Sequence, residues 1–115
     1  MGRIRRGDII IVNFEPIKGS EQGGIRPALV IQNDIYNQYS PVTIVASITS
    51  RKFTKDFPTN VFISKEDSKL KRDSTILLNQ IRTIDKSRIK KVISRLNPYL
   101  MFQVDLAIKT SLALD

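Results

Sequence analysis

Residues 7–14, GDIIIVNF, form a run of isoleucine and valine that starts at a glycine and stops before Glu15 and Pro16. Short β-branched runs closed by turn residues are typical of buried β-strands. Residues 26–32 (RPALVIQ) and 42–48 (VTIVASI) have the same character and predict two further strands. Four shorter runs extend the set of predicted strands: residues 59–63, 74–78, 82–84 and 91–93. So many short strands in one small chain predict a barrel or a curled antiparallel sheet of about five to seven strands.

Two segments carry the signals of helices. Ser64 and Asp67 have the spacing of a capping box, which predicts a helix of one or two turns over residues 64–70. Near the end of the chain, Asn97 can cap a helix that begins at Pro98. Four apolar residues then fall on one face of this helix, which we expect to pack on the sheet: Met101, Val104, Ile108 and Leu112. We therefore expect the whole chain of 115 residues to form a single α+β domain.

The composition narrows the chemistry open to this chain. It contains no cysteine and no histidine, which excludes disulfides, thiolate metal sites and catalytic triads built on histidine. Any hydrolytic reaction must use carboxylates, lysine, arginine or hydroxyl side chains. No apolar stretch approaches the roughly 20 residues of a transmembrane helix, and the basic start lacks the apolar segment of a signal peptide. Together with the absence of cysteine, this favours a cytoplasmic protein.

The charge balance favours a polyanionic partner. Nineteen lysine and arginine residues against eleven aspartate and glutamate residues give a net charge of +8 and a pI near 10.1. Such a balance is typical of proteins that bind nucleic acid, and a basic protein without such a partner is the alternative. Two smaller groups of cations are interpreted as solvated surface: Arg3, Arg5 and Arg6 at the start, and Lys69, Lys71 and Arg72 after the short helix. Glu66 and Asp67 are interpreted as helix-capping residues and not as a metal site.

A glycine-rich loop is predicted between the first two strands, at residues 18–24 (KGSEQGG). Its glycines leave backbone N–H groups accessible. Arg26 follows directly, and Pro27 restricts it to an extended conformation. A loop that ends in a fixed guanidinium suits a phosphate clamp. The alternative is an ordinary hairpin loop followed by a solvated arginine.

Two further segments are candidates for binding nucleic acid. Residues 49–58 (TSRKFTKDFP) combine three cations, two phenylalanines and three hydroxyl groups, a mixture that suits a groove for single-stranded nucleic acid. The alternative is that Phe53 and Phe57 fold into the core beneath an ordinary charged loop. Residues 79–82 (NQIR) are predicted as a loop at the end of a strand. Their amides either read base edges or satisfy backbone groups there.

The chain resembles the MazF/PemK toxin family in three motifs that occur in the family's order. Gly7, Asp8 and Ile9 open the first predicted strand, residues 19–27 read GSEQGGIRP, and residues 77–85 read LLNQIRTID. The resemblance extends to the SLAL stretch near the C-terminus and so covers nearly the whole chain. It implies a small SH3-like barrel that works as a homodimer. It also implies a ribosome-independent endoribonuclease of a toxin–antitoxin system.

The resemblance also implies roles for individual residues. Arg26 and Thr49, at the start of the second predicted strand and the end of the third, correspond to the family's catalytic pair. Contacts to RNA are implied for five residues: Ser20, Glu21, Gln22, Ser50 and Gln80. The composition of residues 49–58 adds Arg51 and Phe57 to the candidate RNA-binding residues. Asn79 departs from the family's pattern, because an acidic residue is expected before that glutamine.

The reaction implied by the resemblance is sequence-specific cleavage of single-stranded RNA. The ribose 2′-OH attacks the adjacent phosphorus and leaves a 2′,3′-cyclic phosphate and a 5′-OH. Because the nucleophile belongs to the substrate, no metal and no cofactor is required. Arg26 and Thr49 are expected to stabilise the negative charge on phosphorus. The general base stays open, since an arginine is a poor base, whereas Glu21 has a more suitable pKa.

Two other functions compete with this interpretation. The CcdB-type gyrase poisons share the fold and act by binding a protein, and a non-catalytic RNA-binding module would keep the basic groove. The presence of Arg26 and Thr49 within their motifs argues against both. The expected partners are single-stranded RNA, a second copy of the chain and a cognate acidic antitoxin of the MazE type. No membrane partner is expected.

Overall fold

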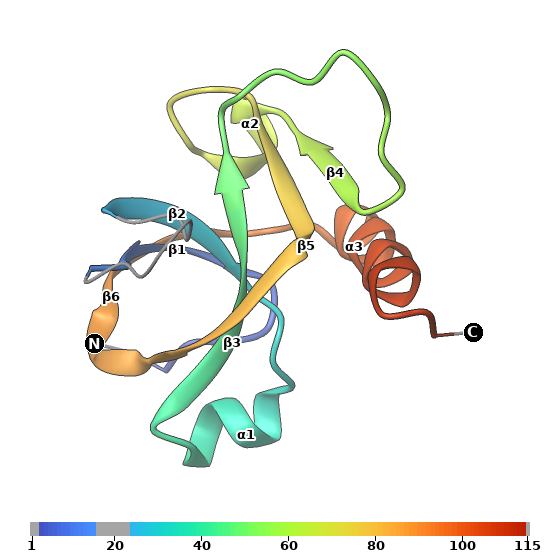
Figure 1. The fold of residues 1–115 in the computed structure, drawn as a ribbon. Helices are drawn as coiled ribbons and strands as arrows, with labels where there is room; N and C mark the ends of the chain where they lie inside the picture. Colours follow the sequence, from blue (N-terminus) through green and yellow to red (C-terminus); the bar gives the residue numbers. More distant parts are fainter. Residues whose placement is uncertain (1–2, 16–23, 115) are drawn as a thin grey trace.

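The computed structural model describes residues 3–15 and 24–114. These residues form a six-stranded antiparallel sheet with three α-helices (Figure 1). In chain order the elements are β1 (Asp8–Asn13), β2 (Ile25–Val30), α1 (Asp34–Tyr39), β3 (Val42–Thr49), β4 (Asn60–Ile63), α2 (Lys65–Ser68), β5 (Ser74–Asp85), the 3₁₀ helix η1 (Lys86–Arg88), β6 (Ile89–Arg95) and α3 (Pro98–Ser111). The strand order is β4-β5-β3-β2-β1-β6, with every neighbouring pair antiparallel. The sheet curls but does not close, because β4 and β6 are its two edges. This confirms the predicted curled α+β fold.

β5 is one strand of 12 residues, where the sequence pattern predicts two short strands separated by a loop at residues 79–82. It pairs with β3 over both of its ends, from Thr75 to Leu77 and from Ile81 to Asp85, and the register changes between these two parts. Ala46 lies opposite Ile81, whereas Ser47 lies opposite Leu77. The three residues of β5 between these pairs have no partner on β3 and bulge from the ladder. The loop prediction was wrong because a polar bulge has the same composition as a loop.

The predicted helix caps are confirmed. The side chains of Ser64 and Asn97 each accept the backbone N–H of the third residue that follows, at 3.1 and 2.9 Å. The apolar face of α3 differs in one respect from the prediction. Val104 and Ala107 are its buried residues, whereas Leu112 is 56% exposed because the helix ends one residue before it. In the described part of the chain, no helix is long and apolar enough to cross a membrane.

Two hydrophobic clusters lie on opposite faces of the curled sheet. Ile9 and Leu29 belong to the cluster that α3 covers. Their neighbours Ile10 and Val30 belong to the second cluster, which the curl of the sheet encloses. Successive residues of a strand point to opposite faces, so β1 has to be apolar on both sides. This explains why residues 7–14 read as a continuous apolar run and not as an alternating one.

α1 lies between the predicted strands at residues 26–32 and 42–48, where the sequence analysis predicts no helix. Asn33 caps the helix by accepting a backbone N–H of its first turn at 3.0 Å. Asn37, which is completely buried, fastens the helix to the sheet. Its Nδ2 donates to the carbonyl oxygen of Gln32 at 2.8 Å, and its Oδ1 accepts the hydroxyl of Thr43 at 2.7 Å. The buried amide thus replaces an apolar anchor for this short helix.

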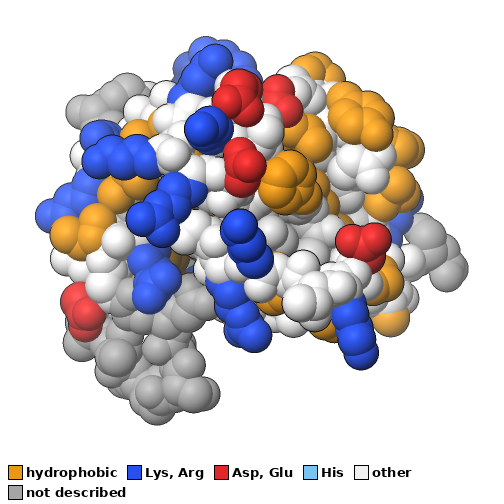
Figure 2. Space-filling view, turned by 90° about the horizontal axis from the view of Figure 1, so that it is seen from above, with side chains coloured by type: hydrophobic (Ala, Val, Ile, Leu, Met, Phe, Trp, Pro, Cys, Tyr) orange, Lys and Arg blue, Asp and Glu red, His pale blue; other side chains and the backbone are white. Residues whose placement is uncertain are grey.

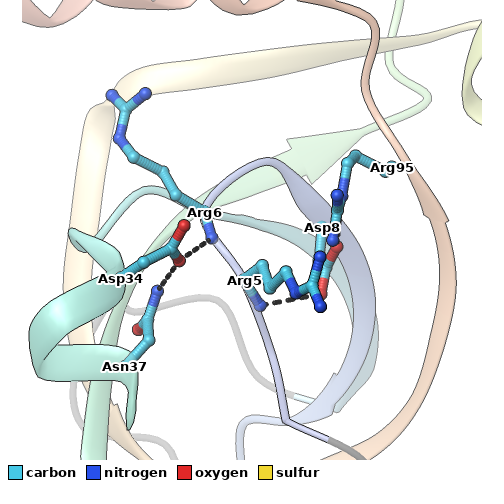
Figure 3. Close-up of polar contacts among 6 residues, drawn as sticks. All are labelled: Arg5, Arg6, Asp8, Asp34, Asn37 and Arg95. Carbon is cyan, nitrogen blue, oxygen red and sulfur yellow. Dashed lines mark hydrogen bonds and ion pairs between the residues drawn. The ribbon is translucent and has the colours of Figure 1, made fainter.

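A second polar network ties the N-terminal segment to the rest of the molecule (Figure 3). Asp34 accepts the backbone N–H of Arg6 at 2.7 Å, and this hydrogen bond lowers the pKa of the Asp34 carboxyl. The Arg6 guanidinium pairs with Asp105 of α3 at 2.7 Å, and Arg95 of β6 pairs with Asp8 at 3.3 Å. The interpretation of the basic start as solvated surface is therefore wrong for Arg6.

We expect Asn37→Ala to lower the free energy of unfolding by about 2–4 kcal/mol, because it leaves the half-buried carbonyl of Gln32 and the buried hydroxyl of Thr43 without their hydrogen bonds. Chemical denaturation followed by circular dichroism measures this change. The control is Gln38→Ala on the exposed side of the same helix, which we expect to change stability by no more than about 0.5 kcal/mol. Equal stability of the two variants would contradict the anchoring role of Asn37.

Candidate active site

Arg26 and Thr49 stand near the ends of the neighbouring strands β2 and β3 and line the same groove. The ladder between the two strands ends where Ala28 pairs with Ser47, two residues from Arg26 on β2 and two residues from Thr49 on β3. Residues two apart along a strand share a face, so the sheet carries both side chains to one side. Together with Ser50 they line a groove of about 730 Å³, which we call the active-site groove. The structure thus brings together three of the candidate residues.

Thr49 presents its hydroxyl in a defined orientation. Its Oγ1 accepts the backbone N–H of Arg51 at 3.1 Å, which occupies one lone pair of the oxygen. Among the residues that the structure describes, none accepts the hydroxyl hydrogen. The hydrogen is therefore available to an oxygen of a ligand in the groove. Arg26, whose side chain is exposed, adds the planar donors of a guanidinium.

Four cations that the sequence does not connect with Arg26 also line the active-site groove. They are Lys69, Lys71 and Arg72, between α2 and β5, and Lys91 of β6. We call these four residues the basic wall. The interpretation of the first three as solvated surface missed their position beside Arg26 and Thr49. Nothing in their spacing reveals it, because only the packing of the α2 region against β6 brings the segments together.

The charge of the groove has one sign within the described residues. Apart from Arg26 and the basic wall, its lining is apolar, hydroxylated or glycine. Figure 2 views the molecule from the end that carries α2, and its blue lysine and arginine side chains spread over the left half of this face. Much of the orange apolar surface lies on the other half. An extended anion fits this half of the face better than an apolar ligand does.

A smaller hollow of about 180 Å³ adjoins the groove at Thr49, which lines both. Phe53 and Phe57 line this hollow with their rings packed edge to face, 6.0 Å between centroids. The Arg51 guanidinium carbon lies 5.2 Å from the centroid of the Phe53 ring. Neither ring belongs to a core cluster, and Phe57 is 46% exposed. The alternative that both rings fold into the core is therefore wrong. We call this site the aromatic hollow.

Three amide side chains line the aromatic hollow: Asn60 at the start of β4, and Asn79 and Gln80 in the bulge of β5. An amide offers both hydrogen-bond donors and an acceptor, and such groups can form specific hydrogen bonds with the edge of a base. Asn79, the departure from the family's pattern, thus lies in the hollow itself. Asn60 is a member of the site that the sequence analysis missed, because its position depends on the pairing of β4 with β5.

Three of the candidate residues, Ser20, Glu21 and Gln22, lie outside the described residues. The described end of the same segment, Gly24, lines the active-site groove and has a φ of 80°, a conformation that favours glycine. Within the described ranges, no group of three metal-binding side chains is present.

The chain matches known proteins over nearly its whole length. Residues 5–112 match the family model for a PemK-like, MazF-like toxin of type II toxin-antitoxin system. A protein of Staphylococcus epidermidis named Endoribonuclease MazF is 49% identical over 112 residues, which cover 97% of this chain and 93% of that protein.

Solved structures share the fold. The crystal structure of MazF (Form-I) from Deinococcus radiodurans aligns with a TM-score of 0.82 at 26% identity, covering 99% of this chain and 100% of that one. A crystal structure of MazE-MazF (Form-II) from the same organism aligns with a TM-score of 0.79 at 25% identity, covering 100% of both chains. These alignments agree with the strand order and the curled sheet described above.

Proposed function

Since the chain belongs to the family of PemK-like, MazF-like toxins of type II toxin–antitoxin systems, we propose that it is an endoribonuclease. It cleaves single-stranded RNA at specific sequences in the cytoplasm, needs no metal, and leaves a 2′,3′-cyclic phosphate and a 5′-OH. The observation that carries this proposal is that Arg26 and Thr49 line one groove together with four further cations. Both residues are donors, and both stand where a phosphodiester can reach them.

The mechanism starts from the substrate's own 2′-OH, which attacks the neighbouring phosphorus. Negative charge then grows on the non-bridging oxygens. The Arg26 guanidinium places two parallel N–H donors on these oxygens, and the hydroxyl of Thr49 adds a third donor. Removing one donor from such a site typically costs a factor of about 10²–10³ in rate. The two residues therefore supply stabilisation of charge and no covalent chemistry.

Sequence specificity is proposed to arise in the aromatic hollow. Phe57 offers an exposed ring on which a base can stack. Asn60, Asn79 and Gln80 surround it with amide donors and acceptors. Where an acidic side chain at position 79 would only accept hydrogen bonds, Asn79 can also donate. We therefore expect Asn79 to alter which base this hollow accepts.

Two protein partners complete the proposal. The MazF of Deinococcus radiodurans has been crystallised with MazE, and a net charge of +8 suits an acidic antitoxin segment that folds as it binds. We propose that such a segment occupies the active-site groove and excludes RNA. We also propose that the chain works as a homodimer, a state that sedimentation velocity at micromolar concentration measures.

The chemical groups at the ends of the cleaved RNA fragments test the proposed reaction directly. We expect the purified protein to cleave a long single-stranded RNA equally well with and without EDTA, since the nucleophile is the ribose 2′-OH. Mass spectrometry should find 2′,3′-cyclic phosphates and 5′-OH ends. A 2′-deoxy residue at the cleaved position serves as the control and should block cleavage there. Fragments that carry 5′-phosphates would point to a different hydrolysis.

The catalytic pair is tested by removing single donors. We expect Arg26→Ala and Thr49→Val each to lower kcat by a factor of about 10² or more, while Thr49→Ser, which keeps the hydroxyl, retains most of the activity. Thr54→Val removes an exposed hydroxyl outside both sites and is the matched control. Single-turnover cleavage rates measure the effect. Normal turnover by a folded Arg26→Ala variant would refute the assignment.

The role of Phe57 in the aromatic hollow is tested by a separate substitution. Loss of one stacked base costs about 1–3 kcal/mol, so Phe57→Ala should weaken RNA binding by a factor of about 5 to 150. The cleavage products should stay the same, and the melting temperature should change little, because the ring lies outside the core. Tyr99→Ala on α3 removes a ring that is 70% exposed and is the control. A large loss of stability without any change in RNA affinity would instead assign Phe57 a structural role.

A further inference from the structure

We propose that the basic wall is a phosphate-binding subsite that holds the RNA backbone on one side of the cleaved linkage. The aromatic hollow then holds a base on the other side. This inference rests on the proposed ribonuclease function and extends it to residues that neither the motifs nor the catalytic pair include. The ligand is the phosphodiester backbone of a single strand.

The position of the wall follows from the way the two sites meet. Thr49 lines both the active-site groove and the aromatic hollow. A strand whose reacting phosphate lies at Thr49 therefore has the basic wall on one side and the phenylalanine rings on the other. The groove, at about 730 Å³, is much larger than the hollow, at about 180 Å³. It has room for backbone beyond the cleaved linkage.

The chemistry of the lining selects backbone and not bases. No aromatic side chain and no carboxylate lines the groove within the described part of the chain. Stacking and the reading of base edges need rings and amides, and these lie in the aromatic hollow. Lysine presents a compact charge that suits a phosphate oxygen at many orientations. The basic wall is thus suited to binding the phosphate groups of RNA whatever the base sequence.

No carboxylate of the described residues lies within ion-pair distance of the basic wall. Elsewhere in the molecule Arg6 pairs with Asp105, and Arg95 pairs with Asp8. In the described ranges none of the four wall residues takes part in an ion pair. Cations held around one groove raise the local positive potential, which attracts a polyanion and speeds its association.

The backbone that carries the wall is fixed by its own hydrogen bonds. Leu70 packs against the main core cluster, and its N–H donates to the hydroxyl of Ser68 at 3.0 Å. The hydroxyl of Ser74 donates to the carbonyl oxygen of Arg72 at 3.0 Å. Lys69 ends α2 with a φ of 65°, which turns the chain sharply at this point. Because the segment is already ordered, binding a phosphate there costs little backbone entropy.

The test is the salt dependence of binding, measured by fluorescence anisotropy on a mixed-sequence 2′-O-methyl RNA oligonucleotide that cannot be cleaved. The wall variant carries Lys71→Gln, Arg72→Gln and Lys91→Gln, three exposed positions. Each lost phosphate contact makes the log–log salt slope about 0.7 shallower. Between about 50 and about 200 mM salt, wild-type binding should therefore weaken roughly 20-fold more than binding of the wall variant.

The control variant also loses two lysines and one arginine, but at positions outside the groove. It carries Arg3→Gln, Lys90→Gln and Lys109→Gln, all exposed and absent from the groove lining. We expect it to keep the steep salt slope of the wild type. In cleavage of a long RNA, the wall variant should raise KM and leave kcat unchanged, as expected for loss of uniform binding. Matching melting temperatures of the two variants establish that both are folded.

Three outcomes separate the possibilities. If the wall variant and the control variant share one salt slope and one affinity for RNA, the inference is overturned while the catalytic proposal stands. If the wall variant loses binding to a polyglutamate peptide but not to RNA, the wall serves an acidic protein partner and the inference is again overturned. If the wild type neither binds nor cleaves RNA, the proposed function fails first. The inference stands only if the wall variant, and not the control variant, shows a shallower salt slope and a lower affinity for RNA.

Discussion

The change of register between β3 and β5 determines where the functional groups lie. At Ala46 and Ser47 the ladder skips three residues of β5, and a bulge of this kind bends its strand and increases the local twist. The first part of β5 also pairs with β4, where Asn60 lies opposite Leu77. The bulge therefore starts next to the beginning of β4, and this is how amides distant in sequence come to line one hollow.

A second constraint is the absence of groups that titrate near neutral pH from the active-site groove. Arg26 and the basic wall supply positive charge, and Thr49 supplies a hydroxyl group, while no histidine or carboxylate is among the described lining residues. The groove thus offers positive charge and hydrogen-bond donors. This arrangement suits a reaction in which the substrate carries its own nucleophile and the protein stabilises the charge that develops.

The sequence predicts much of the fold, because Ile/Val runs and helix caps are local signals. Ser64, Asn97 and Pro98 mark their helices correctly. The errors occur where contacts with residues outside the segment decide the local structure. α1 depends on the buried contact between Asn37 and Thr43, and the continuity of β5 depends on its pairing with β3.

The candidate site likewise contains residues that the sequence identifies and residues that it does not. Arg26 and Thr49 stand in recognisable motifs, and the pairing of β2 with β3 then explains why they line one groove. Lys91 carries no such signal, because it reaches the groove only through the pairing of β6 with β1, where Lys91 lies opposite Ile11. Asn60 likewise lies in no recognisable motif. Motifs identify the candidate reacting groups, whereas the rest of the groove lining is set by tertiary packing.

The open sheet has a consequence for how the molecule behaves among other chains. Each edge strand exposes a row of backbone N–H and C=O groups that can template pairing with a foreign strand. β4 limits this risk by its length, which is only four residues. β6 is longer, but Lys90, Lys91 and Arg95 place three cations along it, and a charged edge resists the addition of another strand. Lys91 therefore serves as a gatekeeper against aggregation in addition to lining the groove.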